Sequence, residues 1–168
     1  MYPRGGQIVN IGEVCSREVY IVRPAEPLAD AVAEMHKRHV GALVIVEEMR
    51  DKVRPVGVVT DRDAIRAQVL RGSGLSRLTI ADAMNADPLT LAETCGIAEA
   101  ISRMSARGVR RAPVVSDSGD LVGIVSFDDL LPVAAEQLMA LARLIGDQAR
   151  REGSGSVDAG PARTAAQA

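Results

Sequence analysis

Two seven-residue stretches of the chain, GVVTDRD at Gly57–Asp63 and GIVSFDD at Gly123–Asp129, follow one pattern. Each has a glycine, two β-branched apolar residues, a hydroxyl residue, two variable positions and an aspartate. An apolar run that ends in Thr or Ser, with an acid three residues later, is typical of a strand leading into the N-terminus of a helix. Because this junction occurs twice, the sequence predicts two copies of one structural unit.

The similarity between the two copies extends beyond these junctions. IGEVCSREVYIV, which begins at Ile11, aligns without a gap with IADAMNADPLTL, which begins at Ile80, at an offset of 69 residues. The offset holds through LADAVAEMHKRHV and GALVIV, against IAEAISRMSARGV and RRAPVV, and falls to 66 at Gly57 and Gly123. EEMRDKVRPV is three residues longer than SDSGDLV, so we expect the extra residues to lie in a turn between two strands.

Each copy reads as a short helical turn followed by a β-α-β-β-α unit, which predicts an α/β (α+β) fold. We expect the turns at 11–15 and 80–84, the first strands at 20–22 and 89–91, the paired strands at 42–46 with 56–59 and 113–115 with 121–125, and the closing helices from Asp61 and Phe127. Leu28, Val32 and Met35 have the spacing of a buried helical face, which the second copy repeats, and Pro27 suits the first turn of that helix.

The size of each copy predicts that the two pack together. A unit of about 60 residues buries little core by itself, so we expect the sheets to pack face to face about a pseudo-two-fold axis. The Gly- and Ser-containing segment 72–79 is expected to link the copies as a flexible joint.

Composition narrows the possible functions. With 168 residues, a net charge of −2, one Phe, two Tyr and no Trp, the chain lacks the features that attract nucleic acid or stack its bases. Cys15 and Cys95 are far apart and match no metal spacing, so we expect reduced thiols and no metal site. We find neither a secretory signal nor an apolar run of about 20 residues, and therefore expect a cytoplasmic protein without a membrane partner.

The doubled motifs resemble a tandem pair of cystathionine β-synthase (CBS) domains, the arrangement called a Bateman module. The resemblance covers domains at 8–71 and 80–133, with the linker at 72–79 between them. It implies a cleft with two sites for adenosine-containing ligands: AMP, ADP or ATP, with S-adenosylmethionine or NAD as further options. It also implies a disc-like homodimer that senses or regulates a separate protein rather than catalysing a reaction.

The hydroxyl and acid of each junction are candidate ribose ligands: Thr60 with Asp63, and Ser126 with Asp129. An ionised carboxylate accepts hydrogen bonds from ribose hydroxyls, and the N–H groups of a helix N-terminus favour a nearby phosphate. The same residues also fit an N-terminal capping box, and the two interpretations are compatible.

Further positions would complete such a site. The expected aliphatic slot for the base consists of Val22, Ala42, Val44, Leu91, Ala112 and Pro113. The expected phosphate ligands are Arg62, Arg110, Arg111 and His39. Core packing is the alternative for the first set, and a solvated basic surface is the alternative for the second. The cations differ between the copies, so we expect the two sites to differ in affinity.

The remainder of the chain reads as one helix and a tail. We expect a break or a fresh helix start at Pro132, a helix over 134–150 and a disordered tail over 151–168. The helix carries an apolar stripe, which we expect to pack across a homodimer interface; it consists of Leu138, Met139, Leu141, Leu144 and Ile145.

A regulatory module that binds an adenine nucleotide is therefore the leading hypothesis, and a ligand-free dimerisation or interaction module is the alternative. We find no catalytic triad, zinc spacing, P-loop lysine or activated cysteine, and expect no enzyme activity.

Overall fold

The computed structural model describes residues 10–50 and 52–154. The chain divides after Leu130 into two compact units, and the first unit contains both copies, called here repeat 1 (11–71) and repeat 2 (80–130). One sheet has the order β1-β2-β3-β4, and the other has the order β5-β6-β7. The strands are β1 (Ile21–Val22), β2 (Ala42–Met49), β3 (Lys52–Thr60), β4 (Asn85–Ala86), β5 (Leu91–Ala92), β6 (Arg111–Val115) and β7 (Leu121–Ser126).

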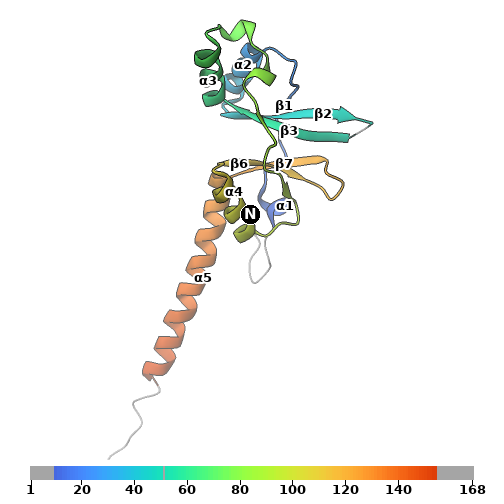
Figure 1. The fold of residues 1–168 in the computed structure, drawn as a ribbon. Coiled ribbons are helices and arrows are strands. Elements are labelled where there is room, and N and C mark those ends of the chain that lie inside the picture. The colour runs from blue at the N-terminus through green and yellow to red at the C-terminus, as the bar shows by residue number, and fades with distance from the viewer. Residues whose placement is uncertain (1–9, 51, 155–168) are drawn as a thin grey trace, which may run out of the picture. The chain divides into compact units, whose positions relative to one another are not determined.

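The two sheets have the same pattern of strand directions. In each, the first strand pairs in parallel with the second, and the second pairs antiparallel with the third. Helices α2 (Leu28–Arg38) and α3 (Asp61–Arg71) lie on the outer side of one sheet, and α4 (Ile97–Arg107) lies on the outer side of the other (Figure 1). The predicted α+β class and order of elements are confirmed.

The helices α2 and α4 form for the same reason. In α2 the buried residues Leu28, Ala31 and Met35 follow the helical period and pack on sheet residues. Val32, expected on this face, is only partly buried, because the contact centres on its small neighbour Ala31. Pro27 is the N-cap just outside the helix rather than in its first turn.

The opening turn of each repeat packs against the other repeat. In repeat 1, α1 (Ile11–Val14) donates from the Ile11 and Gly12 amides to carbonyls of repeat 2, over 2.8 Å each. The 3₁₀ turn η2 (Ile80–Asp82) donates from equivalent amides back to repeat 1 over 2.9 to 3.0 Å. The repeats therefore exchange their first elements, and Ile80 joins the repeat 1 core.

This exchange explains the glycine of each junction. Asn85 in β4 pairs with Val58 beside Gly57, and the bridge Ser16–Ile124 forms the equivalent pair beside Gly123. A Cβ at Gly57 would lie 2.7 Å from the Met84 methyl, and one at Gly123 would lie 2.6 Å from the Cys15 sulfur. The glycines thus leave room for the segment that crosses from the other repeat.

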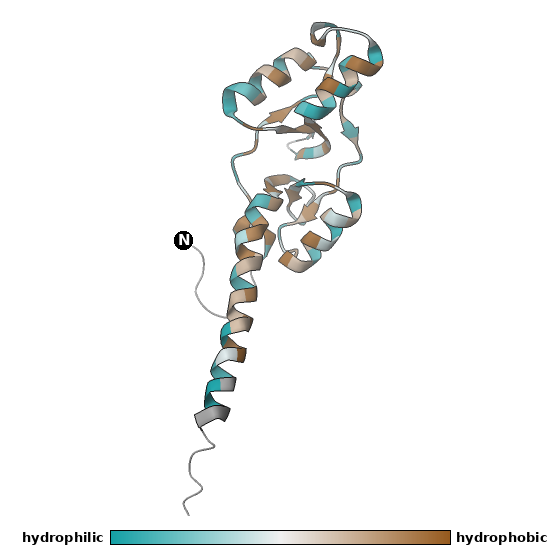
Figure 2. Ribbon diagram, turned by 90° about the vertical axis from the view of Figure 1, so that its left-hand side faces the viewer, coloured by the Kyte–Doolittle hydropathy of each residue, from teal (hydrophilic) through white to brown (hydrophobic). Residues whose placement is uncertain are grey.

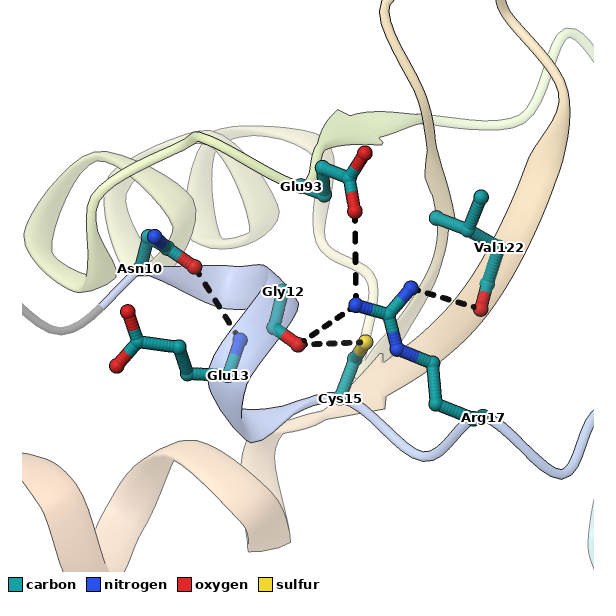
Figure 3. Close-up of polar contacts among 7 residues, drawn as sticks. All are labelled: Asn10, Gly12, Glu13, Cys15, Arg17, Glu93 and Val122. Carbon is teal, nitrogen blue, oxygen red and sulfur yellow. Dashed lines mark hydrogen bonds and ion pairs between the residues drawn. The ribbon is translucent and has the colours of Figure 1, made fainter. Parts of the chain in front are cut away.

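Arg17 holds the crossing segment of repeat 1 in place (Figure 3). Its guanidinium donates to the Gly12 carbonyl at 2.9 Å and to the Val122 carbonyl at 3.2 Å, and forms an ion pair with Glu93 at 3.5 Å. The equivalent residue of repeat 2 is Ala86, which is held instead by strand pairing in β4. The crossing segment of repeat 1 is thus held by side-chain hydrogen bonds of Arg17, and that of repeat 2 by the strand β4.

Several sequence expectations about connections are wrong. The insertion in repeat 1 lengthens the β2–β3 hairpin as far as the Met49–Lys52 pair, because its residues continue the antiparallel ladder. The linker 72–79 is no free joint: it contains the 3₁₀ turn η1 (Leu75–Arg77), and its Leu78 is buried and accepts from the Leu28 amide at 2.9 Å. The first strand of repeat 2 lies at β5 rather than at 89–91.

The last helix, α5 (Phe127–Ser154), runs through Pro132 without the expected break. Pro132 lies in the second turn, where its missing N–H removes a single helical hydrogen bond. Residues 151–154, expected in a disordered tail, are helical, and residues 155–168 lie outside the described part of the chain. Within that part, no helix combines the length and apolar character needed to cross a bilayer.

Candidate functional site

A cavity of about 380 Å³ lies between the repeats. Repeat 1 contributes the junction Thr60–Asp63 with Val58 and Gly41. Repeat 2 contributes the segment from Asn85 to Leu89 and the end of α4 with the start of β6. The lining residues are Gly41, Val58, Thr60, Asp61, Arg62, Asp63, Asn85, Asp87, Pro88, Leu89, Arg107, Gly108, Val109, Arg110 and Arg111. The volume is in the range of small-molecule sites.

Asp63 is held rigidly at the mouth of α3. Its Oδ2 accepts from the Thr60 amide at 3.1 Å and from the Thr60 hydroxyl at 2.6 Å, and the Asp63 amide donates back to Thr60 at 3.2 Å. This is a complete capping box. The other oxygen, Oδ1, lies 3.5 Å from Arg66, and the side chain is 19% exposed. The cap therefore engages one carboxylate oxygen only, and the other has the exposed Arg66 as its neighbour.

Four arginines line the cavity: Arg62, Arg107, Arg110 and Arg111. Within the described chain, the guanidinium groups of Arg62 and Arg111 have no hydrogen-bond or ion-pair partner. Arg111 reaches toward repeat 1, since a Cβ at Gly41 would lie 3.8 Å from its guanidinium nitrogens. Two unpaired cations beside one cavity are well suited to an anion.

Arg107 is a lining residue that sequence reasoning missed. Its guanidinium donates to the backbone carbonyl of Asp87 at 2.8 Å and to its carboxylate at 3.0 Å. Asp87 itself has a left-handed backbone with φ of 62°. The alignment of Arg107 with Arg38 was the signal that could have found it, because both end the same helix of their repeats.

The residues expected to form the base slot lie outside the lining of this cavity. The six residues are buried in the two sheets, and none lines the cavity: Val22, Ala42, Val44, Leu91, Ala112 and Pro113. They lie in the strands, where Val44, Leu91 and Ala112 are fully buried, and Val22 and Ala42 keep 7% and 8% of their surface exposed. The apolar walls come instead from Val58, Pro88, Leu89 and Val109.

Three other predicted residues lie away from the cavity lining. His39 is the left-handed C-cap of α2, with φ of 55°, because the chain must turn there into β2. Ser126 and Asp129 form the same hydrogen bonds as Thr60 and Asp63, with the Ser126 hydroxyl 2.6 Å from Asp129 Oδ2. Neither of these two lines the cavity.

Titratable groups outside the cavity are held by neighbours. The hydrogen bond that Tyr20 donates to Glu18 raises the pKa of the phenol, because the bond stabilises its protonated form. Burial raises the pKa of the Cys15 thiol above its usual value, and does the same for Cys95. Among the described residues, no cluster of three metal-ligating side chains occurs.

Comparison with known proteins supplies the family. The model of the CBS domain matches this chain twice, over residues 11–70 and 80–136. The uncharacterized protein MK0525 of Methanopyrus kandleri is 34% identical over 125 residues, which are 74% of this chain and 62% of that protein. The chain thus spans under two thirds of the length of this relative.

Two solved structures share the fold. One is the CBS domain pair of MJ0100 in complex with 5′-methylthioadenosine and S-adenosyl-L-methionine. Its match to this chain has a TM-score of 0.66 at 22% identity, and it covers 78% of this chain and 99% of the MJ0100 chain. CBSX2 in complex with AMP has a TM-score of 0.63 at 21% identity, with coverages of 76% and 96%. At these identities the likeness shows the fold alone. With both repeats matched by the family model, the chain belongs to the CBS domain family and contains two CBS domains in tandem.

Proposed function

We propose that the chain is a regulatory module that binds an adenosine-containing nucleotide in the cavity between its repeats and signals to a separate protein. One observation carries this proposal: a single cavity combines a fixed carboxylate, two unpaired arginines and aliphatic walls. These are the three kinds of group that a ribose, a phosphate and a purine require.

The side chains suggest how such a ligand would lie. Asp63 Oδ1 would accept from a ribose hydroxyl, because Oδ2 is already engaged by Thr60. Arg62 and Arg111 would face the phosphate from the two repeats. The base would then rest between Val58 and Leu89, with backbone groups at its edge.

Two structural neighbours support this class of ligand. CBSX2 was solved with AMP, and the MJ0100 pair was solved with two adenosine derivatives that carry no phosphate. The unpaired arginines of this chain favour AMP, ADP or ATP over S-adenosylmethionine, whose sulfonium is a cation. NAD carries phosphates and remains within the proposed class.

A thermal-shift screen of the full chain tests the proposal. AMP, ADP, ATP, NAD and S-adenosylmethionine are added at about 100 times the dissociation constant, where a true ligand stabilises by about 2.7 kcal/mol and raises Tm by roughly 5 °C or more. Asp63→Asn, which keeps an acceptor for the cap, is expected to lose most of the shift. Absence of a shift with all five ligands would contradict the proposal and favour a ligand-free interaction module.

We also propose that the chain forms a homodimer through α5. Six large apolar side chains of this helix are 59–70% exposed: Leu131, Leu138, Met139, Leu141, Leu144 and Ile145. Figure 2 shows both apolar and polar residues along the coloured part of the helix. At 100° per residue, Leu138, Leu141 and Ile145 share a face, opposite Arg143 and Asp147.

The exposed area and charge of α5 favour a second copy as the occupant. Six such side chains expose on the order of several hundred Å², at the upper end of what a monomer leaves uncovered and a large part of the roughly 800 Å² that each partner of a stable dimer buries. The polar face carries two acidic residues, Glu136 and Asp147, and two basic residues, Arg143 and Arg150, whose charges cancel. Asp147 and Arg150 form an ion pair at 3.2 Å. A neutral polar face does not suit an anionic lipid surface.

Sedimentation velocity of the full chain tests the dimer. The unaltered protein is expected to sediment as a dimer at tens of micromolar, and Leu138→Asp with Leu141→Asp is expected to sediment as a monomer, because the buried charges oppose association. Ala140→Asp places the same charge on the opposite side of the helix and is expected to remain dimeric. A monomeric unaltered protein would contradict the proposal.

A further inference from the structure

The exchange of opening segments creates two equivalent positions in the first unit. Ala42 pairs with Thr60 in one sheet, and Arg111 pairs with Ser126 in the other. The crossing pairs Val58–Asn85 and Ile124–Ser16 are related in the same way. The residues 18–20, 38–42 and Arg110 therefore stand to Ser126–Asp129 as 87–89, 107–111 and Gly41 stand to Thr60–Asp63. We call this second set of residues the second position.

The two unpaired cations of the cavity, Arg62 and Arg111, have no counterpart at the second position. By the repeat offsets, Asp128 replaces Arg62 and Ala42 replaces Arg111. Arg38 replaces Arg107, and both guanidinium groups are bound to a carboxylate: Arg107 to Asp87 at 3.0 Å, and Arg38 to Glu34 at 2.7 Å. Arg38 also lies 4.7 Å from the centre of the Tyr20 ring.

The local charge is therefore reversed. Four arginines and three aspartates line the cavity, so its lining has one more positive than negative charge. The second position has Arg38 and Arg110 against three carboxylates, those of Glu18, Asp128 and Asp129. Arg110 lies 3.8 Å from Asp128, which offsets part of its charge there. A phosphate would meet unpaired cations in the cavity and an excess of carboxylates at the second position.

The apolar groups also differ. Tyr20 stands where the cavity has Leu89, and Phe127 stands where it has Asp61. The Tyr20 hydroxyl is bonded to Glu18, and Arg38 covers its ring. Tyr20 of the second position is thus held by Glu18 and Arg38, whereas its counterpart Leu89 lines the cavity.

Resting on the proposed function above, we infer that the chain binds one phosphorylated adenosine ligand, in the cavity lined by Asp63, and that the second position rejects phosphate. Asp129 then acts only as the cap of α5. The two junctions have the same hydrogen bonds, but Asp63 also binds the ligand and Asp129 does not. Arg62 and Arg111 determine the preference for a phosphorylated ligand.

Isothermal titration calorimetry of the full chain with AMP and with adenosine tests this inference. We expect one AMP per chain, and at least tenfold weaker binding of adenosine, because adenosine lacks the phosphate that Arg62 and Arg111 would contact. Asp63→Asn is expected to weaken AMP binding at least tenfold. Its matched control, Asp129→Asn, alters the equivalent cap and is expected to leave affinity within twofold and the stoichiometry at one.

The outcomes separate the two proposals. Two AMP per chain, equal affinity for adenosine, or a loss on Asp129→Asn as large as that on Asp63→Asn would overturn the inference while leaving nucleotide binding intact. Absence of heat and of any thermal shift with both ligands would overturn the proposed function and the inference together. Melting temperatures of the two aspartate variants show whether a lost cap, rather than a lost ligand contact, lowers affinity.

Discussion

The junctions Thr60–Asp63 and Ser126–Asp129 have the same internal geometry and different surroundings. In both, the hydroxyl of Thr60 or Ser126 donates to Oδ2 of the aspartate three residues later, over 2.6 Å. The backbone amide of the same Thr or Ser donates to the same oxygen. The first junction lines the 380 Å³ cavity together with arginines of the other repeat, and the second does not line that cavity. The comparison teaches that a capping motif is determined locally, whereas its use as a binding site depends on residues brought to it by the fold.

The junction glycines give the largest expected difference between the repeats. Gly123→Ala should destabilise the protein by about 3 kcal/mol, because the new Cβ would lie 2.9 Å from the rigid Ser16 carbonyl. Gly57→Ala should cost about 1 kcal/mol, because its nearest atom is the movable end of Met84. Urea denaturation measures both. Equal losses would show that the two crossings are equally tight.

Charge reversal sharpens the comparison of the two positions. Arg62→Asp should weaken AMP binding by about 30-fold, equivalent to roughly 2 kcal/mol, because an unpaired cation beside the phosphate becomes an anion. Asp128→Arg, the reciprocal change at the second position, should not weaken it. Calorimetric titration measures the dissociation constant of AMP for each variant. A similar loss of affinity in both variants would contradict a single phosphate site.

The crossing segments should differ in what holds them. Arg17→Ala should lower the free energy of unfolding by about 1 kcal/mol, since it removes two bonds to backbone carbonyls from a half-exposed guanidinium. Arg17→Lys keeps the charge but not the fork of donors, and should recover only part of the loss. Full recovery in Arg17→Lys, by urea denaturation, would show that charge alone matters.

The helix C-caps give the smallest expected effect. His39 and its counterpart Gly108 have nearly the same left-handed backbone, with φ of 55° and 63°. His39→Gly should stabilise the protein by up to about 1 kcal/mol by removing backbone strain. His39→Ala removes the imidazole but keeps the Cβ, and should bring no such gain. Thermal unfolding of both variants distinguishes strain from loss of the side chain.

Patterns within one segment predicted local structure well. Helical spacing located α2 and α4, and the doubled junction located the strand ends at Thr60 and Ser126. Local patterns failed where a contact came from elsewhere. Leu78 in the linker is buried by α2, and the expected base slot is buried within the sheets. Arg107 lines the cavity only because its repeat packs against Thr60 and Asp63.

The sequence by itself determined the duplication, the order of elements, the two capping boxes and the family, because these depend on residue spacing within one repeat. Only the tertiary structure decided that the repeats exchange their opening turns and that a single described cavity unites Asp63 with arginines of the other repeat. The physical reason is that a capping hydrogen bond spans three residues, whereas the field and shape of a binding site are summed over side chains that the chain brings together from distant positions.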